Sequence, residues 1–449
     1  MEGGQLLQRY NHAIPRYTSY PTVPQWQTWS NQDGWKEQLT AVGGTTQEGL
    51  AIYIHLPYCE HLCTYCGCNK KITTNHRVEK PYIERLLQEW RLYLRALGDD
   101  RMLIRELHLG GGTPTFFAPE QLKQLIEGIF EHAGRHPQLE MSFEGHPNNT
   151  THEHLQVLRE MGFQRVSFGV QDLDPEVQRV INRIQPLENL VQVTQWSRNM
   201  GYESVNYDLV YGLPLQTEEK LAKTLTEVIA LRPDRVAFYG YAHVPWKSRA
   251  QRLYDESHLP TPEQRAALYE LGRQAFLEAG YEDIGMDHFA LPQDSLLKAL
   301  HSKTLHRNFM GYTANPSKVL IGLGVSAISD LGAAFGQNSK ELVQWERMVD
   351  AGQFPVEKGL LLSQEDIIRQ KMILQMSCLG EVELPNSWTF LEHQHALLNQ
   401  MLADELLQLE GNRLSLTATG KLFTRHACSL FDAYLMPENA LLKQFSQAV

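Results

Sequence analysis

The chain has 449 residues, of which 42% are hydrophobic and 21% charged, and its formal net charge is −11. This length exceeds what one hydrophobic core usually serves, so we expect two domains, or one large domain with appendages. The excess of Asp and Glu over Lys and Arg, without a concentrated basic tract, argues against a nucleic-acid-binding protein. No run of about 18 apolar residues indicates a membrane span, and the first thirty residues lack a signal-peptide pattern, so we expect a cytoplasmic protein.

Short β-rich runs alternate with helix-like stretches from residue 51 to residue 239. Such alternation predicts parallel strands joined by helical crossovers, and therefore an α/β sheet or barrel. The predicted strands are residues 51–56, 104–109, 140–143, 165–170, 205–210 and 235–239. The predicted helices between them are residues 81–97, 119–133, 153–161, 187–200 and 218–231.

Polar groups or bare backbone come at the end of successive predicted strands. In folds of this kind the carboxyl ends of the strands form one rim, where functional groups collect. A helix-capping role could explain any single polar residue, but it explains the whole alignment poorly. We therefore expect one shared site. The residues concerned are a cysteine-rich loop, Gly110–Gly112, Glu144, Gln171 and Asp172, Asp208, and residues 241–243.

The pattern changes after about residue 255, where helical stretches dominate at residues 262–279, 364–375 and 391–410. A short sheet is predicted near residues 414–416. We expect an N-terminal arm (residues 1–45), a barrel (46–290) and a mainly α-helical C-terminal domain (291–449).

The six cysteines are unevenly distributed, which is typical of a metal site and not of a disulfide scaffold. Cys59, Cys63 and Cys66 are separated by three and then two residues, and such thiolates can hold three irons of a 4Fe–4S cluster and leave the fourth open. Zinc is the alternative metal, but structural zinc sites generally use two separated ligand pairs, and the sequence has no second pair. Cys68 follows Cys66 too closely for an easy tetrahedral site. The two distant cysteines, Cys378 and Cys428, are expected to be buried thiols.

The run Tyr53-Ile-His-Leu-Pro-Tyr-Cys59, its cysteine spacing and the later Gly110-Gly-Gly-Thr-Pro-Thr115 resemble the radical S-adenosylmethionine (SAM) superfamily. The resemblance implies a partial (β/α)6 barrel with a 4Fe–4S cluster whose open iron binds the amino and carboxylate groups of S-adenosylmethionine. One-electron reduction would cleave the sulfonium to methionine and a 5′-deoxyadenosyl radical. The glycines would let the backbone approach the methionyl part of the cofactor.

Further segments are similar to the oxygen-independent coproporphyrinogen III oxidase family: residues 16–22, 66–70, 169–172, 208–214, 285–290, 305–313 and 324–329. This resemblance implies oxidative decarboxylation of coproporphyrinogen III, in which two propionates become vinyl groups and protoporphyrinogen IX forms in haem biosynthesis. It also implies two bound S-adenosylmethionine molecules, a reduced flavodoxin- or ferredoxin-like electron donor, and a monomer.

The resemblance assigns roles by position. Cys59, Cys63 and Cys66 would bind the cluster, and Tyr53, Gly111 and Glu144 would contact the S-adenosylmethionine on it. The second molecule would contact Tyr65, Gly112, Thr113, Gln171, Arg183, Asp208, Ala242 and Ile328. After Glu144 the chain reads Gly-His-Pro-Asn-Asn, where many relatives carry an apolar residue and then Asp-Pro-Arg, so the role of residues 145–149 is open.

Two alternatives stay open for the function: another tetrapyrrole-directed radical enzyme, such as a haem-opening methyltransferase, or a haem-trafficking protein. Arg16 and Arg307 are candidates for binding substrate carboxylates, although surface or capping roles are equally expected for each. The aromatic residues of the arm either cover a macrocycle or pack onto the barrel. They are Tyr10, Tyr17, Tyr20, Trp26 and Trp29.

Overall fold

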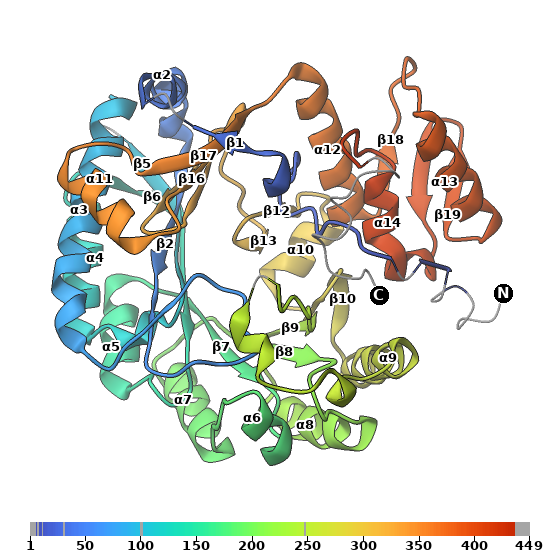
Figure 1. The fold of residues 1–449 in the computed structure, drawn as a ribbon, viewed down its shortest axis with the longest axis horizontal. Helices are drawn as coiled ribbons and strands as arrows, with labels where there is room; N and C mark the ends of the chain where they lie inside the picture. Colours follow the sequence, from blue (N-terminus) through green and yellow to red (C-terminus); the bar gives the residue numbers. More distant parts are fainter. Residues whose placement is uncertain are drawn as a thin grey trace.

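The computed structural model describes residues 6, 9–10, 12–29, 32–98, 102–246 and 248–435. Residues 436–449 of the predicted C-terminal domain and residues 1–5, 7–8, 11 and 30–31 of the predicted arm lie outside the described residues. Figure 1 shows a curved sheet with helices around it and a smaller, mainly helical part beside it. Within the described ranges, no helix is both long enough and apolar enough to cross a bilayer.

Six parallel neighbouring strands form the centre of the sheet, and all six were predicted. Their helical crossovers lie on the outer side of the sheet (Figure 1), and the whole is the expected partial (β/α)6 barrel. In order the strands are β2 (Leu50–Leu56), β5 (Leu103–Gly111), β6 (Gly134–Gly145), β7 (Arg165–Gln171), β8 (Ser204–Tyr211) and β9 (Arg235–Gly240). The helices are α3 (Glu79–Leu97), α4 (Pro119–Phe130), α5 (His152–Met161), α6 (Pro175–Val180), α7 (Leu187–Asn199) and α8 (Glu218–Leu231).

The sheet continues past residue 290, where the sequence analysis placed the end of the barrel. β14 (Leu320–Leu323) pairs parallel to β2, with Leu320 opposite Ala51. The later strands are only three to six residues long, too short for a clear alternation of apolar and polar residues. From β14 outward the strands are β15 (Ile328–Asp330), β16 (Ala334–Asn338), β17 (Val356–Leu361) and β1 (Gln27–Thr28), and the opposite edge carries β11 (His288–Ala290) and β10 (Glu282–Gly285).

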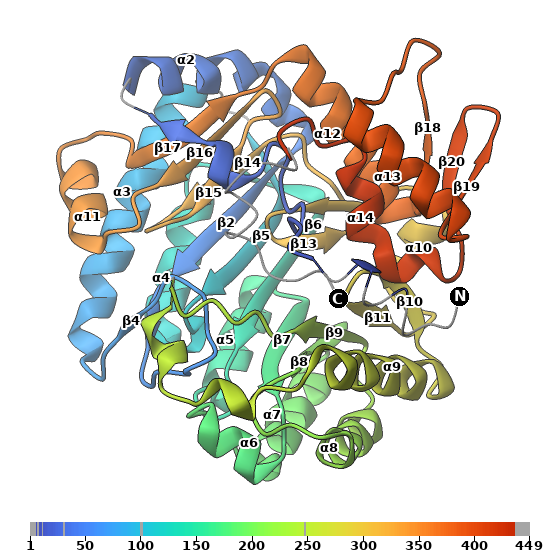
Figure 2. The same cartoon turned by 45° about the vertical axis from the view of Figure 1, so that its right-hand side comes forward.

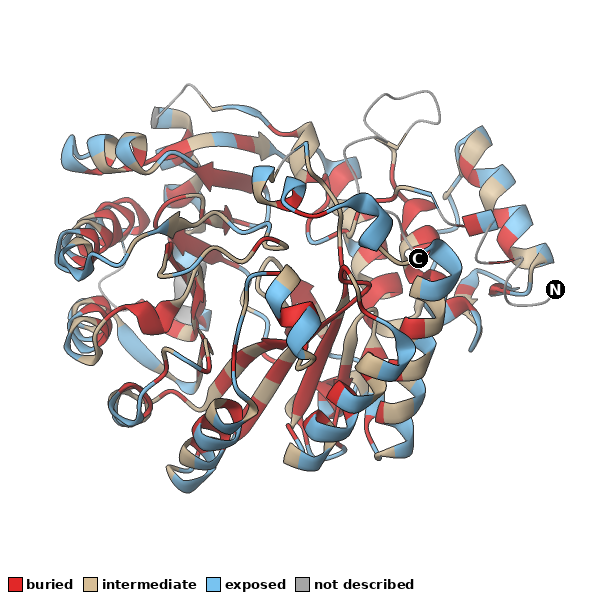
Figure 3. Cartoon of the chain, turned by 60° about the horizontal axis from the view of Figure 1, so that its bottom comes forward, coloured by how far each residue is buried: buried red, intermediate tan, exposed pale blue. Residues whose placement is uncertain are grey.

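Burial explains why the central strands read as nearly continuous apolar runs. Six of the seven residues of β2 are buried, because helices cover one face of the sheet and the barrel interior occupies the other. Figure 3 shows the strands mostly buried and the outer helix faces mostly exposed. The remaining helices and strands outside the C-terminal part are α2 (Gln32–Val42), α9 (Pro262–Glu278), α10 (Ser295–His301), α11 (Leu342–Asp350), β3 (Tyr58–Cys59), β4 (Lys71–Ile72), β12 (His306–Asn308) and β13 (Gly311–Thr313).

The C-terminal part contains α12 (Gln364–Leu379), α13 (Glu392–Ala403), α14 (Thr424–Ser429) and a sheet of β18 (Glu381–Glu383), β20 (Arg413–Leu416) and β19 (Leu407–Glu410), as Figure 2 shows. The predicted helix over residues 391–410 is therefore wrong at its carboxyl end. Glu405 has φ +56, a left-handed conformation that ends α13 and lets the chain turn into β19.

The aromatic residues of the arm pack into the protein, as one of the two alternatives predicted. Tyr10, Tyr17 and Tyr20 are buried in a hydrophobic cluster with residues of α12, α13 and α14. The ring of Trp26 stacks on Phe335 of β16, with 5.1 Å between centroids. Cys378 and Cys428 are also buried, as expected.

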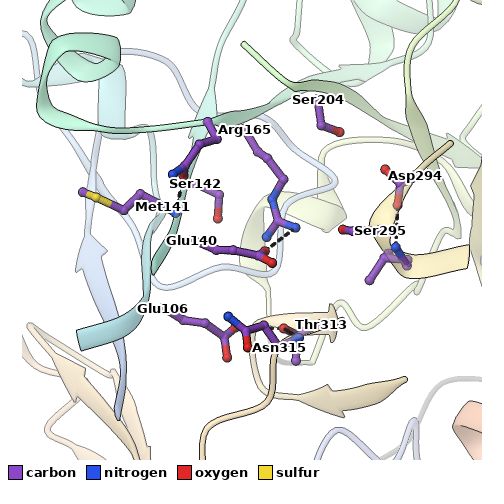
Figure 4. A network of polar contacts seen from close by, with 12 residues as sticks. Glu106, Glu140, Met141, Ser142, Arg165, Ser204, Asp294, Ser295, Thr313 and Asn315 are labelled. Carbon is purple, nitrogen blue, oxygen red and sulfur yellow. Dashed lines mark hydrogen bonds and ion pairs between the residues drawn. The ribbon is translucent and has the colours of Figure 1, made fainter. Parts of the chain in front are cut away.

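Charged side chains close the amino-terminal end of the barrel (Figure 4). Arg235 donates to Asp294 over 2.6 Å, and Arg165 forms an ion pair with Glu140 at 2.9 Å. Thr313 of β13 donates to Glu106 over 3.0 Å. Each of these contacts joins residues of two different elements. The network therefore holds the β12–β13 hairpin and α10 against the strands.

Glu89 of α3 joins the central strands to the strands added beyond β2. Its side chain is completely buried and accepts hydrogen bonds from Gly324 N (2.9 Å), Asn338 Nδ2 (2.7 Å) and Trp345 Nε1 (3.0 Å). Burial raises the pKa of Glu89 to about 7, although all three donors favour its charged form.

Glu89→Gln is expected to lower the free energy of unfolding by about 1–3 kcal/mol at pH 5, because the amide nitrogen cannot accept a hydrogen bond, whereas both oxygens of the protonated carboxyl can. Between the ordinary pKa of 4.5 and about 7, folded Glu89 binds more protons than unfolded Glu89, so wild-type stability falls as pH rises through this window. Glutamine does not titrate, so the stability difference should narrow from pH 5 to pH 8 in urea denaturation. The exposed Glu84→Gln on the same helix is the control, and a difference that widens with pH would contradict the assignment.

Candidate functional site

A cavity of about 620 Å³ lies at the carboxyl ends of the parallel strands, where the sequence predicted a shared site. Residues from the cysteine loop and from β5, β6, β7 and β8 meet there, although they are far apart in the sequence. The predicted site residues that line it are Cys59, Cys63, Tyr65, Cys66, Gly111, Gly112, Thr113, Glu144, Gln171, Arg183 and Asp208.

Three predicted site residues do not line this cavity. The hydroxyl of Tyr53 is 3.1 Å from His55 Nδ1, and its ring stacks on that of His108. Ala242 lies in the loop after β9, and Ile328 begins β15. Their predicted contacts with S-adenosylmethionine stay predictions.

The three thiols of the cysteine loop have separate partners around the cavity. Thr113 Oγ1 donates to Cys59 Sγ over 3.3 Å, and Arg183 Nη1 donates to Cys63 Sγ over 3.5 Å. A hydrogen bond from Cys68 lowers the pKa of Cys66. In the described part of the chain, no three His, Cys, Asp or Glu side chains lie close enough together to share one metal ion. A 4Fe–4S cluster also spaces its thiolates apart, since each binds a different iron, so the donor set fits such a cluster.

Arg183 brings a positive charge to the cysteine loop. Its Nη2 donates to Gly169 O over 2.5 Å, while its Nε is buried and has no hydrogen-bond partner among the described residues. A Cβ on Gly169 would lie 2.9 Å from Nη2, so the glycine leaves room for the guanidinium. A half-buried cation beside thiolates stabilises their charged, metal-binding form.

The glycines at the end of β5 are required by the packing of the protein itself, beyond any contact with a cofactor. Gly111 has φ +116, and a Cβ there would lie 2.8 Å from the His55 ring. A Cβ on Gly112 would lie 2.6 Å from the carbonyl carbon and oxygen of Pro57. Gly112 N donates to Leu56 O over 2.9 Å, so the end of β5 lies directly against the start of the cysteine loop.

Two carboxyl groups whose pKa values are shifted in opposite directions face the cavity. Burial disfavours the charged form of Glu144, but hydrogen bonding to His108 (3.4 Å) and the Gly111 N–H (3.3 Å) outweighs burial and leaves the pKa of Glu144 below its usual value. Burial and the charge of Glu144 raise the pKa of Asp208 to about 7, although Ser167 donates to Asp208 over 3.2 Å. Glu144 is therefore ionised, whereas Asp208 lies near the boundary between its two protonation states at neutral pH.

The adjacent polar residues Gln171, the last of β7, and Asp172 have different roles. Gln171 lines the cavity with φ +67, an uncommon conformation for a residue with a side chain. Asp172 is buried away from the cavity and accepts hydrogen bonds from Gln216 (2.6 Å) and Thr224 (3.0 Å). The left-handed conformation of Gln171 thus directs its own side chain into the site and that of Asp172 into the core.

The comparisons with known proteins agree with this geometry. A model of the radical SAM superfamily matches residues 53–228. An oxygen-independent coproporphyrinogen III oxidase of Pseudomonas aeruginosa is 38% identical over 456 residues, which cover 99% of this chain and 98% of the relative. A relative of the same description from Escherichia coli K12 is 37% identical, with 99% and 98% covered. A solved structure of coproporphyrinogen III oxidase from Escherichia coli, described as a radical SAM enzyme, superposes with a TM-score of 0.88 at 34% identity and covers 96% of this chain and 99% of that one.

The chain belongs to the oxygen-independent coproporphyrinogen III oxidase family. As a member of this family it is a radical SAM oxidoreductase that uses a 4Fe–4S cluster and S-adenosylmethionine.

In this member of the coproporphyrinogen III oxidase family, a buried glutamine that the sequence analysis missed ties two loops of the site together. Gln251 Nε2 donates to Tyr65 O (2.9 Å) and Ala242 O (3.2 Å), and its Oε1 accepts from Val244 N (2.6 Å). Gln251 is 1% exposed. No motif surrounds it, so only its backbone partners reveal that it connects the cysteine loop to the loop after β9.

Gln251→Ala is expected to reduce activity about tenfold, mainly through a higher KM for S-adenosylmethionine, because buried backbone groups at Tyr65, Ala242 and Val244 lose their partners. Gln251→Glu keeps the acceptor for Val244 N and loses the donor, and it should show a similar defect. Initial rates against cofactor concentration measure this, with the exposed Gln274→Ala as control. An unchanged KM in both Gln251 variants would contradict the role.

Residues 145–149, whose role the sequence left open, are part of the site in this member of the coproporphyrinogen III oxidase family. His146, Asn148 and Asn149 line the cavity. Asn149 donates to Glu60 over 2.7 Å, and Asn148 donates to Ile184 O over 2.8 Å. The loop therefore connects the cysteine loop to the chain segment that carries Arg183.

Proposed function

We propose that the chain catalyses the oxygen-independent oxidative decarboxylation of coproporphyrinogen III to protoporphyrinogen IX, converting two propionates to vinyl groups in haem biosynthesis. The observation that carries the proposal is the cavity in which three cysteine thiols, ionised Glu144 and Asp208 meet at the carboxyl ends of the strands. The homologues at 35–39% identity carry the same name for their activity.

Cys59, Cys63 and Cys66 would hold the cluster, and Glu144 would bind the amino group of the S-adenosylmethionine on it, together with Tyr53 and Gly111. When bound, the cluster and S-adenosylmethionine supply the radical chemistry that removes a hydrogen atom from the propionate β-carbon. This carbon carries no acidic hydrogen that a side-chain base could remove, so the chain's own residues bind, orient and shield the reactants.

The second S-adenosylmethionine would be bound by the groups around Arg183. Gln171 and Asp208 can accept hydrogen bonds from hydroxyl or amino groups, and so can the hydroxyl oxygen of Thr113, whose hydrogen points to Cys59 Sγ. Gly112, whose N–H donates to Leu56 O, would offer close approach to its backbone. Tyr65, Ala242 and Ile328 would complete this set. Because the pKa of Asp208 lies near 7, this carboxyl can either accept or donate a hydrogen bond at neutral pH.

Only the reacting propionate edge of the substrate would enter the barrel interior, where an inner cavity of about 150 Å³ shares Glu144, Asp208 and Tyr239 with the cavity at the carboxyl ends of the strands. Tyr312 and the β12–β13 hairpin close its far side. Such enclosure keeps bulk water from a reactive radical. We also propose that the protein is cytoplasmic and monomeric and receives electrons from a reduced flavodoxin- or ferredoxin-like donor.

The deciding experiment is an anaerobic assay with the reconstituted cluster, S-adenosylmethionine, coproporphyrinogen III and a strong reductant. We expect protoporphyrinogen IX and two molecules of carbon dioxide per tetrapyrrole. Cleavage of S-adenosylmethionine without any vinyl product from coproporphyrinogen III would contradict the proposed substrate.

A further inference from the structure

A separate cavity of about 320 Å³ lies between the barrel and the C-terminal part. Its walls come from the arm, α9, the ends of β8 and β9, the turn between β10 and β11, the 3-10 helix Gly420–Phe423 and α14. Tyr211 and Tyr269 form an aromatic wall, with 5.4 Å between their centroids, and Phe423 also faces the cavity. An apolar wall of this kind suits a hydrophobic ligand that carries charged groups.

Among the described residues that line this cavity, basic side chains outnumber acidic ones by four to two. Each of the two acids has a basic neighbour. Glu270 lies 3.3 Å from Arg273, which is outside the lining, and Asp287 lies 4.0 Å from Arg16, one of the four basic lining residues. The four basic residues are Arg16, Arg265, Lys421 and Arg425. The cavity therefore has an excess of positive charge.

Arg265 is prepared for an anionic partner. Its Nε is buried and has no hydrogen-bond partner among the described residues, although a buried guanidinium N–H normally has one. Its guanidinium lies 5.8 Å from the centroid of Tyr211, and a Cβ on Gly240 would lie 2.6 Å from its Nη2. The glycine thus provides the space in which the guanidinium sits.

Arg16 of the arm places a second guanidinium at the border between this basic cavity and the cavity at the carboxyl ends of the strands. Arg16 Nη2 donates to Gly240 O over 3.1 Å, and its guanidinium carbon lies 5.9 Å from the centroid of Tyr239, which lines both the latter cavity and the inner cavity. Arg307, the other carboxylate candidate, instead donates to Arg16 O over 3.0 Å and positions the arm. The basic cavity is therefore adjacent to the cavity at the carboxyl ends of the strands, and Tyr239 and Gly240 separate the two.

We propose that this basic cavity is a carboxylate subsite that binds the two propionates which the reaction leaves intact; this inference rests on the proposed function. Coproporphyrinogen III carries four propionates on a flexible apolar macrocycle, and two of them survive in the product. Arginine binds carboxylates in bidentate pairs, and the cavity is too small for a whole tetrapyrrole but suits its carboxylate-bearing edge. Binding the unchanged edge would direct the reacting edge toward Tyr239 and the cysteine loop.

Fluorescence titration of the reconstituted holoenzyme tests this with coproporphyrin III, the oxidised and unreactive form of the substrate, and with protoporphyrin IX, which keeps only the two unreacted propionates. Arg265→Gln and Lys421→Gln should each weaken binding of both porphyrins about tenfold, the typical size of one lost charge-assisted contact. Arg265→Lys should weaken it less. The exposed Arg95→Gln on α3 is the matched charge control.

Steady-state kinetics give an independent result. Because the unreacted propionates make the same contacts before and during the reaction, the two glutamine variants should raise the KM for coproporphyrinogen III about tenfold and change kcat less than about threefold. Lys421 is exposed, so its replacement should leave the fold intact. The Lys421 variant therefore tests the subsite even if thermal unfolding shows that Arg265→Gln does not fold.

Unchanged affinity for both porphyrins in the Lys421 variant and in a folded Arg265 variant would overturn the subsite. Weaker binding of coproporphyrin III alone would overturn the assignment to the unreacted propionates. A wild-type protein that forms no protoporphyrinogen IX, yet binds porphyrin in a way that depends on Arg265 and Lys421, would overturn the proposed function and leave the carboxylate site standing.

Discussion

Replacing Cys63 with serine is expected to abolish protoporphyrinogen IX formation and to prevent assembly of a stable cluster. Cys63 faces the cavity beside Arg183, between the two other thiols of the loop. A serine hydroxyl is a harder and far less acidic ligand than a thiolate, so the variant would offer two of the three sulfur ligands. Iron and sulfide analysis after anaerobic reconstitution, together with the product assay, measures both effects.

Cys378→Ala is the matched control, because Cys378 is buried in a hydrophobic cluster away from the cysteine loop. It should retain the wild-type iron content and activity. A Cys63→Ser protein with both wild-type iron content and wild-type turnover would show that this thiol does not bind the cluster.

Gly112→Ala should lower the free energy of unfolding by about 1–3 kcal/mol, the usual cost of overpacking a filled site. The added Cβ would lie 2.6 Å from the backbone of Pro57, and a backbone cannot move aside as the end of a flexible side chain can. The cysteine loop and the end of β5 would have to separate. Because a displacement of about 1 Å at a catalytic site can cost about 100-fold in rate, we expect an activity loss of that order.

Gly44→Ala tests whether the effect is specific, because a Cβ at Gly44 would meet no atom within 4 Å. This control should match the wild type in urea denaturation and in turnover. If Gly112→Ala kept full activity, the close contact between the glycine loop and Pro57 would not be needed for the site.

The elements with long or strongly periodic sequence signals were predicted accurately. The apolar run of β2 and the helix of α3 fall within two residues of their predicted ends. The sequence patterns did not predict elements that were too short, or the end of an element that depended on one residue in an uncommon backbone conformation. β14 and β16 were missed, and α13 was extended through Glu405, whose left-handed conformation depends on the turn into β19.

The site shows the same division. Cys59, Cys63 and Cys66 lie within eight consecutive residues, so the covalent chain itself limits how far apart the thiols can be. Gln251 lies 186 residues from Tyr65, and no local pattern links the two. Only the packed fold reveals the pair, because a hydrogen bond between distant segments depends on how the elements meet.

The sequence by itself therefore determined the spacing of the three cysteines, the alternation of strands and helices, and the rim where the polar groups gather, because each is set by local spacing and by the period of burial. The tertiary structure alone decided that the sheet continues past residue 290, that Arg307 holds the arm, and that Arg16, Arg265 and Lys421 line one cavity. Charges from three distant segments come together only when the arm and the C-terminal part pack against the barrel, and no short-range pattern in the chain records that packing.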